Sequence, residues 1–172
     1  MAEKTKVKVY IDGANMFYTQ KHLGWNLDWA KIKDCIQAKK EVIEWRYYVA
    51  VKQGDENMLE YLRYLNAIGF SAVTKPLKKI RVGAGGEEVK YIYKANFDVE
   101  IATDILLEKS NIDEIIIFSG DSDFEYLVRK LKSLGRNAVI YSSRKTISWE
   151  LKLAASSVIY LDDLEKEIKR IQ

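Results

Sequence analysis

The sequence predicts an α/β fold in which a mostly parallel central sheet carries helices on both faces. Short apolar runs such as residues 7–11 and 114–119 alternate with stretches whose apolar residues recur at helical spacing. Alternating strands and helices favour parallel strands joined by right-handed crossovers. The chain has 172 residues, 48% hydrophobic and 31% charged, which suits one globular domain with a single core. We therefore expect one domain over residues 1–172, with its core at about 7–161 and a C-terminal helix at about 162–172.

The first half of the chain is predicted to contain three strands and three helices. The strands are expected at residues 7–11, 41–52 and 71–74, and the helices at residues 14–23, 29–39 and around 58–65. Asp28 can accept hydrogen bonds from the first amides of the second helix, and Gly69 offers a stop for the third. Pro76, the only proline, is placed in the connection after the third strand.

The second half is predicted to begin with a β-hairpin. Two alternating runs, residues 79–82 and 87–93, flank a glycine-rich run at 83–86. Helices are then expected at residues 96–108, 124–134, 148–155 and 164–171, and strands at 114–119, 138–141 and 158–161. The terminal helix could pack on its own domain or on a partner, so a homo-oligomer stays open.

Composition limits the classes of function. A net charge of +3 is too small to indicate a nucleic-acid binder by itself. One cysteine, Cys35, excludes an internal disulfide, and with one histidine, His22, it leaves no ligand set for zinc, so any metal must be held by oxygen. No apolar stretch suits a signal peptide or a membrane span of about 20 residues, and we expect a cytoplasmic protein without a membrane partner.

Acidic residues directly follow two of the predicted strands. Asp12 follows the first strand, and Asp121 and Asp123 follow the strand at 114–119. In such sheets the ligand-binding crevice lies beyond the carboxyl ends of the strands, where the strand order reverses, so the carboxylates converge if these strands are neighbours. Crowded carboxylates repel and need a cation to stay ionised. Mg²⁺ or Mn²⁺ fits an oxygen ligand set, and two ions about 4 Å apart can support in-line displacement at phosphorus.

A purely structural interpretation of these acids is also open. Asp12 could merely cap the following helix. Ser122 and Glu125 fit a capping box, in which the neighbouring aspartates only favour the helix dipole.

Three motifs together resemble the NYN domain, a branch of the PIN-like nucleases. They are D-G-A-N at residues 12–15, K-A-N-F-D-V at 94–99 leading into a helix with Asp104, and S-G-D-S-D-F at 119–124. The resemblance runs from about residue 7 to 161, and the motifs are specific in combination, although D-G-x-N alone is weak.

The resemblance implies a single PIN-like, Rossmann-like domain with a metal-dependent ribonuclease site that acts on RNA. It implies that the catalytic, metal-binding acids are Asp12, Asp98, Asp121 and Asp123, with Asn15 and Ser119 in support. Asp104 lies six positions beyond Asp98, about 120° around the helix, so a structural or indirect role fits it better.

The hairpin carries four cations, which we call the basic hairpin residues: Lys79, Arg81, Lys90 and Lys94. If Val82 and Glu87 close its loop, Lys79 lies opposite Lys90 and all four share one face, while the other face, with Ile80, Val82, Val89, Tyr91 and Tyr93, packs on the domain. We predict that the basic face guides the RNA backbone toward the metals. A solvated edge that deters aggregation is the alternative.

The sequence also leaves functions other than a ribonuclease open. A non-catalytic RNA-binding or scaffold module of the same fold is the main alternative, and a phosphohydrolase for small esters fits the basic hairpin less well. The glycine-rich run does not open a helix and therefore does not fit a phosphate loop. Trp25, Trp29 and Trp45 could stack on bases, although core packing explains such residues more often.

Overall fold

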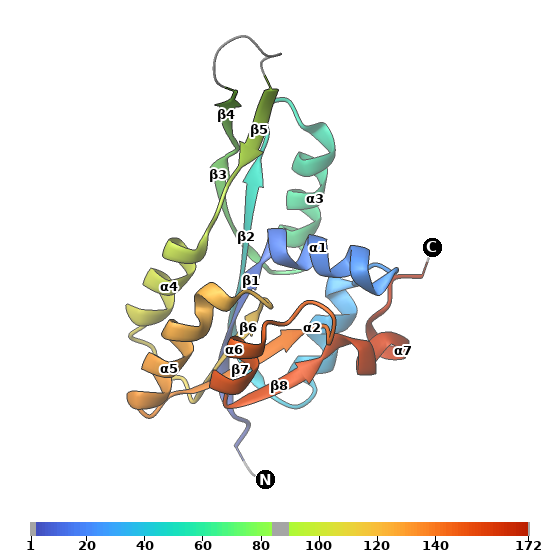
Figure 1. The fold of residues 1–172 in the computed structure, drawn as a ribbon. Coiled ribbons are helices and arrows are strands. Elements are labelled where there is room, and N and C mark those ends of the chain that lie inside the picture. Colours follow the sequence, from blue (N-terminus) through green and yellow to red (C-terminus); the bar gives the residue numbers. More distant parts are fainter. Residues whose placement is uncertain (1–2, 84–89, 172) are drawn as a thin grey trace.

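The computed structural model describes residues 3–83 and 90–171, and its centre is a six-stranded sheet. The strand order is β3-β2-β1-β6-β7-β8, and every neighbouring pair is parallel (Figure 1). The predicted parallel sheet is confirmed. Its strands are β1 (Lys6–Asp12), β2 (Glu41–Val51), β3 (Ser71–Pro76), β6 (Glu114–Phe118), β7 (Asn137–Ser142) and β8 (Ser157–Tyr160).

Helices cover both faces of this sheet. One apolar cluster packs under α1 (Gly13–Leu23), α2 (Trp29–Gln37), α3 (Glu56–Ala67) and α7 (Glu165–Ile168). The other packs under α4 (Asp98–Leu106), α5 (Glu125–Ser133) and α6 (Trp149–Ala154). Successive residues of a strand point to opposite faces, so Ile116 enters the first cluster and Ile117 the second. Burial on both sides explains why the central strands are continuous apolar runs.

Local signals set most of the helix ends. The Asp28 carboxylate accepts a hydrogen bond from the Lys31 amide (3.1 Å), so the predicted cap of α2 is confirmed. Gly69, after α3, has a φ of 88°, a left-handed conformation that glycine adopts without strain. The strand β3 runs two residues further than predicted and ends at Pro76, which an edge strand tolerates because an outward N–H there needs no partner.

Two of the three tryptophans considered as base platforms belong to the core. Trp29 contacts Tyr47 and Phe118 edge-on, and Trp45 stacks on Phe70 with ring centroids 4.8 Å apart. Only Trp25 of these three is partly exposed, just beyond the end of α1.

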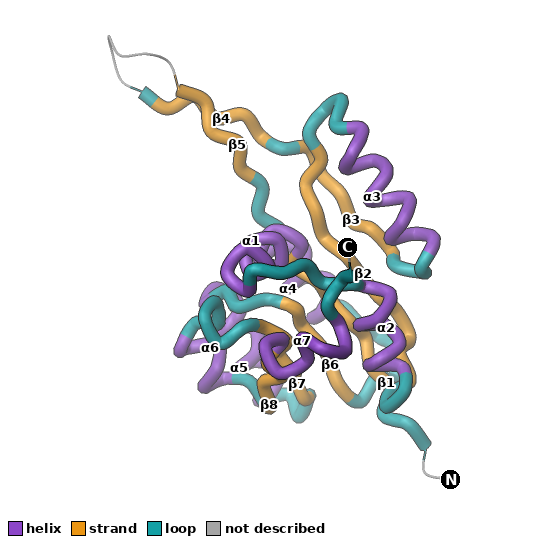
Figure 2. Tube along the Cα trace, turned by 90° about the vertical axis from the view of Figure 1, so that its right-hand side faces the viewer, coloured by secondary structure: helices purple, strands orange, loops and turns teal. Residues whose placement is uncertain are grey.

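The predicted hairpin is present as a separate two-stranded sheet. Its strands β4 (Lys78–Val82) and β5 (Lys90–Lys94) are antiparallel and project away from the domain body, most clearly in Figure 2.

The register predicted for this hairpin is wrong by three residues. Lys79 lies opposite Tyr93 and Val82 opposite Lys90, whereas Glu87, Glu88 and Val89 are outside the described residues. The observed register separates Lys79 from Lys90 but places Lys78 opposite Lys94, so like-charge repulsion does not explain it. The register sets the Lys79 ammonium 4.0 Å from the centre of the Tyr91 ring, a favourable cation–π contact.

The changed register also divides the basic hairpin residues between two faces. Lys79 and Arg81 share one face with the tyrosines, and Lys90 and Lys94 lie on the other. The prediction that one face packs on the domain is wrong as well, because apolar side chains of both faces stay largely exposed. The exposed fractions are 40% for Ile80, 45% for Val82, 50% for Tyr91 and 47% for Tyr93.

The end of the chain packs on its own domain. After a short turn, η2 (Leu161–Leu164), the helix α7 spans only four residues, and its Ile168 is buried beside α2. The next residue, Lys169, forms a β-bridge with Leu27. Across the part of the chain that is described, no helix has the length and apolar character that a membrane crossing requires.

Candidate metal centre

The candidate site lies where the strand order of the sheet reverses. The strands β2 and β3 lie on one side of β1. The strands β6, β7 and β8 lie on its other side, with β6 directly next to β1. Asp12 is the last residue of β1, and Asp121 follows the end of β6 by three residues. The carboxyl ends of two adjacent parallel strands therefore bring these acids to one edge, as the strand-order rule predicts.

Three carboxylates form the centre of the site. Asp98, Asp121 and Asp123 each contribute one oxygen to a group whose members all lie within 4.8 Å of one another. Asp98 begins α4 and is held by Asn96, which donates from Nδ2 to the Asp98 carboxylate (2.5 Å) and accepts from the Asp98 amide (2.6 Å). Asp121 accepts from the Asp123 amide (3.0 Å), which starts the single turn η1 (Ser122–Phe124).

Asp12 lies beside this group but is buried, with 8% of its surface exposed. One carboxylate oxygen accepts from the Asn15 amide (3.1 Å) and thereby caps α1, and the other accepts from the Ser119 hydroxyl (3.3 Å). Helix capping therefore takes up only one of its two oxygens.

The two residues expected to support the site connect its elements. The Asn15 side-chain oxygen accepts from the Gly120 amide (2.9 Å), which ties α1 to the loop after β6. The Ser119 hydroxyl oxygen also accepts from the Asp121 amide (3.2 Å). These bonds hold the loop that carries Asp121 against Asp12.

Burial and mutual repulsion raise the free energy of ionising the carboxyl groups of this site. Desolvation is the main reason that the pKa of Asp12 rises to about 6. Hydrogen bonds from Asn15 and Ser119 oppose the rise, and the charges of Asp98 and Asp121 add to it. Burial likewise raises the pKa of Asp98, and the charges of Asp121 and Asp123 raise it further. A cation bound among these oxygens would stabilise the ionised carboxylates and so offset the free-energy cost of ionisation.

Two glycines permit the close packing behind the aspartates. A Cβ on Gly13 would lie 2.5 Å from the Tyr48 carbonyl oxygen, and one on Gly120 would lie 2.4 Å from the Thr146 carbonyl oxygen. The loop with Thr146 was not identified from the sequence. The glycine before Asp121 is the local sign that another backbone passes there.

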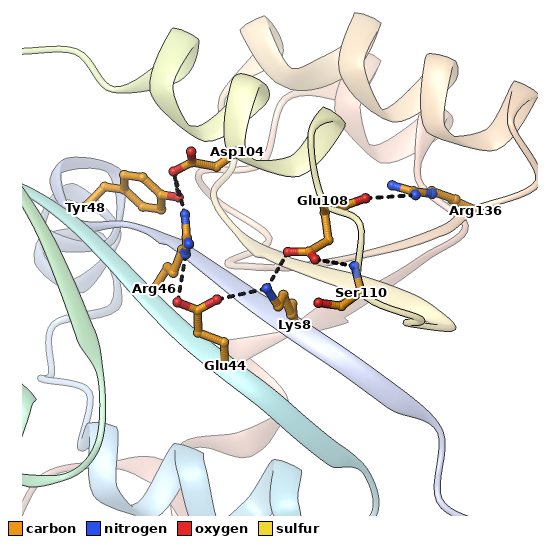
Figure 3. Close-up of polar contacts among 8 residues, drawn as sticks. All are labelled: Lys8, Glu44, Arg46, Tyr48, Asp104, Glu108, Ser110 and Arg136. Atoms are coloured by element: carbon orange, nitrogen blue, oxygen red, sulfur yellow. Dashed lines mark hydrogen bonds and ion pairs between the residues drawn. The ribbon is translucent and has the colours of Figure 1, made fainter.

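Asp104 belongs to a polar network with Tyr48 and Arg46 (Figure 3). It accepts from the Tyr48 hydroxyl (2.7 Å) and pairs with Arg46 (2.9 Å), which also binds Glu44. A buried lysine that the sequence analysis missed, Lys8, continues this network by pairing with Glu44 (2.9 Å) and with Glu108. The network joins α4 to the sheet on the side away from the carboxyl ends of the strands.

The capping box considered for Ser122 and Glu125 is absent. Asp121 occupies the N-cap position of η1, and Glu125 pairs with Arg129 instead (2.5 Å).

Comparison with known proteins identifies the family. The sequence model of the NYN domain matches residues 6–162. The chain belongs to the NYN domain family. Membership implies a PIN-like nuclease fold, in agreement with the parallel sheet and the acidic group at its edge.

Two individual proteins match this chain almost end to end. The low amplitude and bright protein LabA of Synechococcus elongatus is 28% identical over 170 residues, which cover 98% of this chain and 90% of LabA. A crystal structure of a Vibrio parahaemolyticus protein of unknown function superposes with a TM-score of 0.81 at 22% identity over 99% of both chains. At that identity the second match bears on the fold alone.

One of the basic hairpin residues, Lys94, lines a cavity whose wall also contains sequence neighbours of Asp12 and Asp98. This cavity has a volume of about 960 Å³, and its wall includes Gly13 and Asn96. The other three, Lys79, Arg81 and Lys90, lie further out along the hairpin and are exposed.

Proposed function

We propose that this NYN domain hydrolyses RNA phosphodiester bonds with Mg²⁺ or Mn²⁺ held by Asp12, Asp98, Asp121 and Asp123. The observation that carries the proposal is the convergence of three carboxylate oxygens within 4.8 Å of one another, from two separate segments of the chain, beside the buried Asp12. Such a concentration of negative charge is unfavourable unless a cation shares it.

The donor set fits a hard divalent cation. All of the proposed ligands are carboxylate oxygens, which Mg²⁺ and Mn²⁺ prefer. The two residues that would suit softer metals lie elsewhere: His22 bonds to the Tyr18 carbonyl near the end of α1, and Cys35 is on α2. Bound in this site, such an ion would lower the pKa of a water molecule and stabilise negative charge on a phosphate oxygen.

The protein's own groups would orient the reaction. Asn15 and Ser119 fix both oxygens of Asp12, and Asn96 fixes Asp98, so the ligands are held before substrate arrives. With a pKa of about 6, Asp12 is mostly ionised at neutral pH even without metal. Lys94, in the wall of the 960 Å³ cavity, is placed to attract a phosphate of the strand.

Cleavage of end-labelled RNA, with analysis of the new ends, tests this function. We expect cutting in Mg²⁺ or Mn²⁺, none in excess EDTA, and products with a simple terminal phosphate, because the nucleophile is water. Asp121→Asn should abolish cutting, whereas Asp34→Asn, an exposed aspartate on α2, should not.

Two results would contradict the proposal. A 2′,3′-cyclic phosphate product would show attack by the ribose hydroxyl instead of water, and undiminished cutting in EDTA would exclude the metal. RNA binding without any cutting would favour the non-catalytic RNA-binding module.

A further inference from the structure

A continuous groove runs along the outer side of α1. The 960 Å³ cavity, whose wall includes Gly13 and Asn96, adjoins a second cavity of about 1240 Å³, and the two share Phe17, Gln20, Asn26 and Arg170 in their walls. The first reaches the residues next to Asp12 and Asp98, and the second extends past Trp25 to the C-terminal segment. Figure 1 shows this segment ending beside the last turn of α1.

The far half of the groove gathers positive charge. Its wall contains a single acidic residue, Glu165, which pairs with Lys169 (2.8 Å). The chain as a whole is nearly balanced, with 28 basic and 25 acidic residues, so this concentration is local. The basic residues of the wall are Lys21, Lys31, Lys166, Lys169 and Arg170.

Aromatic side chains stand among these cations. Phe17 is 61% exposed on α1, and the Lys21 ammonium lies 4.4 Å from the centre of its ring. Trp25, partly exposed, lies in the wall of the same cavity. A basic groove lined with accessible aromatic rings is the arrangement by which proteins bind single-stranded nucleic acid.

We propose that this groove binds single-stranded RNA on its path to the acidic group, with bases against Phe17 and Trp25 and phosphates near Lys21, Lys166 and Arg170. The proposal rests on the proposed function, because it takes RNA as the substrate. It adds a binding site on the body of the domain, in addition to the projecting hairpin.

The geometry of the groove favours a single-stranded RNA of several nucleotides. The bases of a duplex are stacked inside and cannot lie on Phe17 or Trp25, so a duplex should bind only through its phosphates. The helix α1 has 11 residues and is about 16 Å long. The basic end of the groove is therefore further from the acidic group than one nucleotide spans, and a very short RNA should not reach it.

Binding is measured by fluorescence anisotropy with a labelled 12-nucleotide RNA in EDTA, so that no cleavage interferes. We expect Phe17→Ala to weaken binding about tenfold, the range found for one stacked base. The triple variant Lys21→Gln, Lys166→Gln, Arg170→Gln should reduce the log-log salt slope by about 2. Among the described residues these three side chains form no ion pair or hydrogen bond with protein groups, so the fold should survive, as circular dichroism can verify.

A matched triple variant removes the same charge away from the groove. Lys39, Lys109 and Lys130 are exposed and, within the described part of the chain, are also without side-chain ion pairs or hydrogen bonds. Their change to Gln should leave the slope unchanged. Three results would overturn the proposed RNA-binding groove. They are an equal reduction of the salt slope in both triple variants, duplex RNA that binds as tightly as single-stranded RNA, and full RNA affinity in Phe17→Ala.

Cleavage of a trinucleotide in Mn²⁺ separates this inference from the proposed activity. The double variant Lys21→Gln, Lys166→Gln changes residues that line only the far cavity, so it should cut the trinucleotide at close to the wild-type rate and lose activity on long RNA. Equal loss on both substrates would overturn the proposed RNA-binding groove. If the wild-type protein cuts no RNA but the groove variants still lose binding, the nuclease proposal fails while the groove is supported.

Discussion

Asp12→Asn is expected to stabilise the metal-free protein at neutral pH while it abolishes cleavage. The substitution removes a buried charge with little change in shape. An asparagine oxygen can still accept from the Asn15 amide, and its amide group can donate to the Ser119 hydroxyl oxygen, so the cap on α1 is kept.

The magnitude follows from the raised pKa. The Asp12 pKa moves from an ordinary 3.8 to about 6, mainly because of burial, so the folded state binds this proton more tightly than the unfolded state does. The stability of the wild-type protein therefore falls as pH rises from about 4 to about 6, and stays lower above that. Two pKa units correspond to about 3 kcal/mol, which is the most that Asp12→Asn can recover.

Urea unfolding in EDTA between pH 4.5 and 8 tests this reasoning. The variant should be more stable than the wild type by about 1 kcal/mol at pH 4.5, with the difference growing to as much as about 3 kcal/mol at pH 7. Added Mn²⁺ should stabilise the wild type and narrow the gap. A difference that does not change with pH, or a variant that is less stable at pH 7, would refute the account of a buried, repelled carboxylate.

Three further substitutions test the surroundings of the site. Gly120→Ala should cost about 1 to 3 kcal/mol in urea unfolding and reduce cleavage, because the added Cβ would press on the Thr146 carbonyl; an unchanged stability would argue against that close approach. Lys8→Met should cost about 3 kcal/mol, because it leaves Glu44 and Glu108 without their shared cation, and a neutral result would show that the network contributes little. Changing the four basic hairpin residues to Gln should weaken RNA binding and flatten its log-log salt slope by about 3, whereas an unchanged slope would assign the hairpin a structural role.

The core elements could be predicted because their signals are local or follow from a general rule. Asp28 and Gly69 mark helix ends by chemistry that acts within a few residues, and the structure agrees. The strand-order rule pointed to the carboxyl ends of the strands as the place of the site, on the condition that the strands before Asp12 and Asp121 are neighbours. The structure pairs β1 with β6 and so meets that condition.

The hairpin register could not be predicted, since register is specified strongly only where one face is buried. Ile80 and Tyr91 lie on opposite faces and both are largely exposed, so the pattern of burial contains no information about pairing. Contacts between side chains on facing strands decide the register instead.

Long-range features were also outside the reach of sequence patterns. A lysine within an apolar strand, Lys8, gave no sign that Glu44 and Glu108 would enclose it. The groove forms because Phe17 and Trp25 line the same cavity as the segment around Lys169, about 150 residues away in sequence. Local sequence patterns contain no information about that proximity.

Cleavage and stability measured together for Asp98→Asn and Asp104→Asn test the central claim most directly. The two aspartates lie on the same helix, but Asp98 faces the acidic group and Asp104 bonds to Arg46 and Tyr48. In Mg²⁺, Asp98→Asn should lower the rate of RNA cleavage by about 100-fold or more without loss of stability. Asp104→Asn should keep most of the activity and cost about 1 kcal/mol in unfolding. Equal activity in both variants, or loss of cleavage with Asp104→Asn alone, would contradict the metal site proposed here.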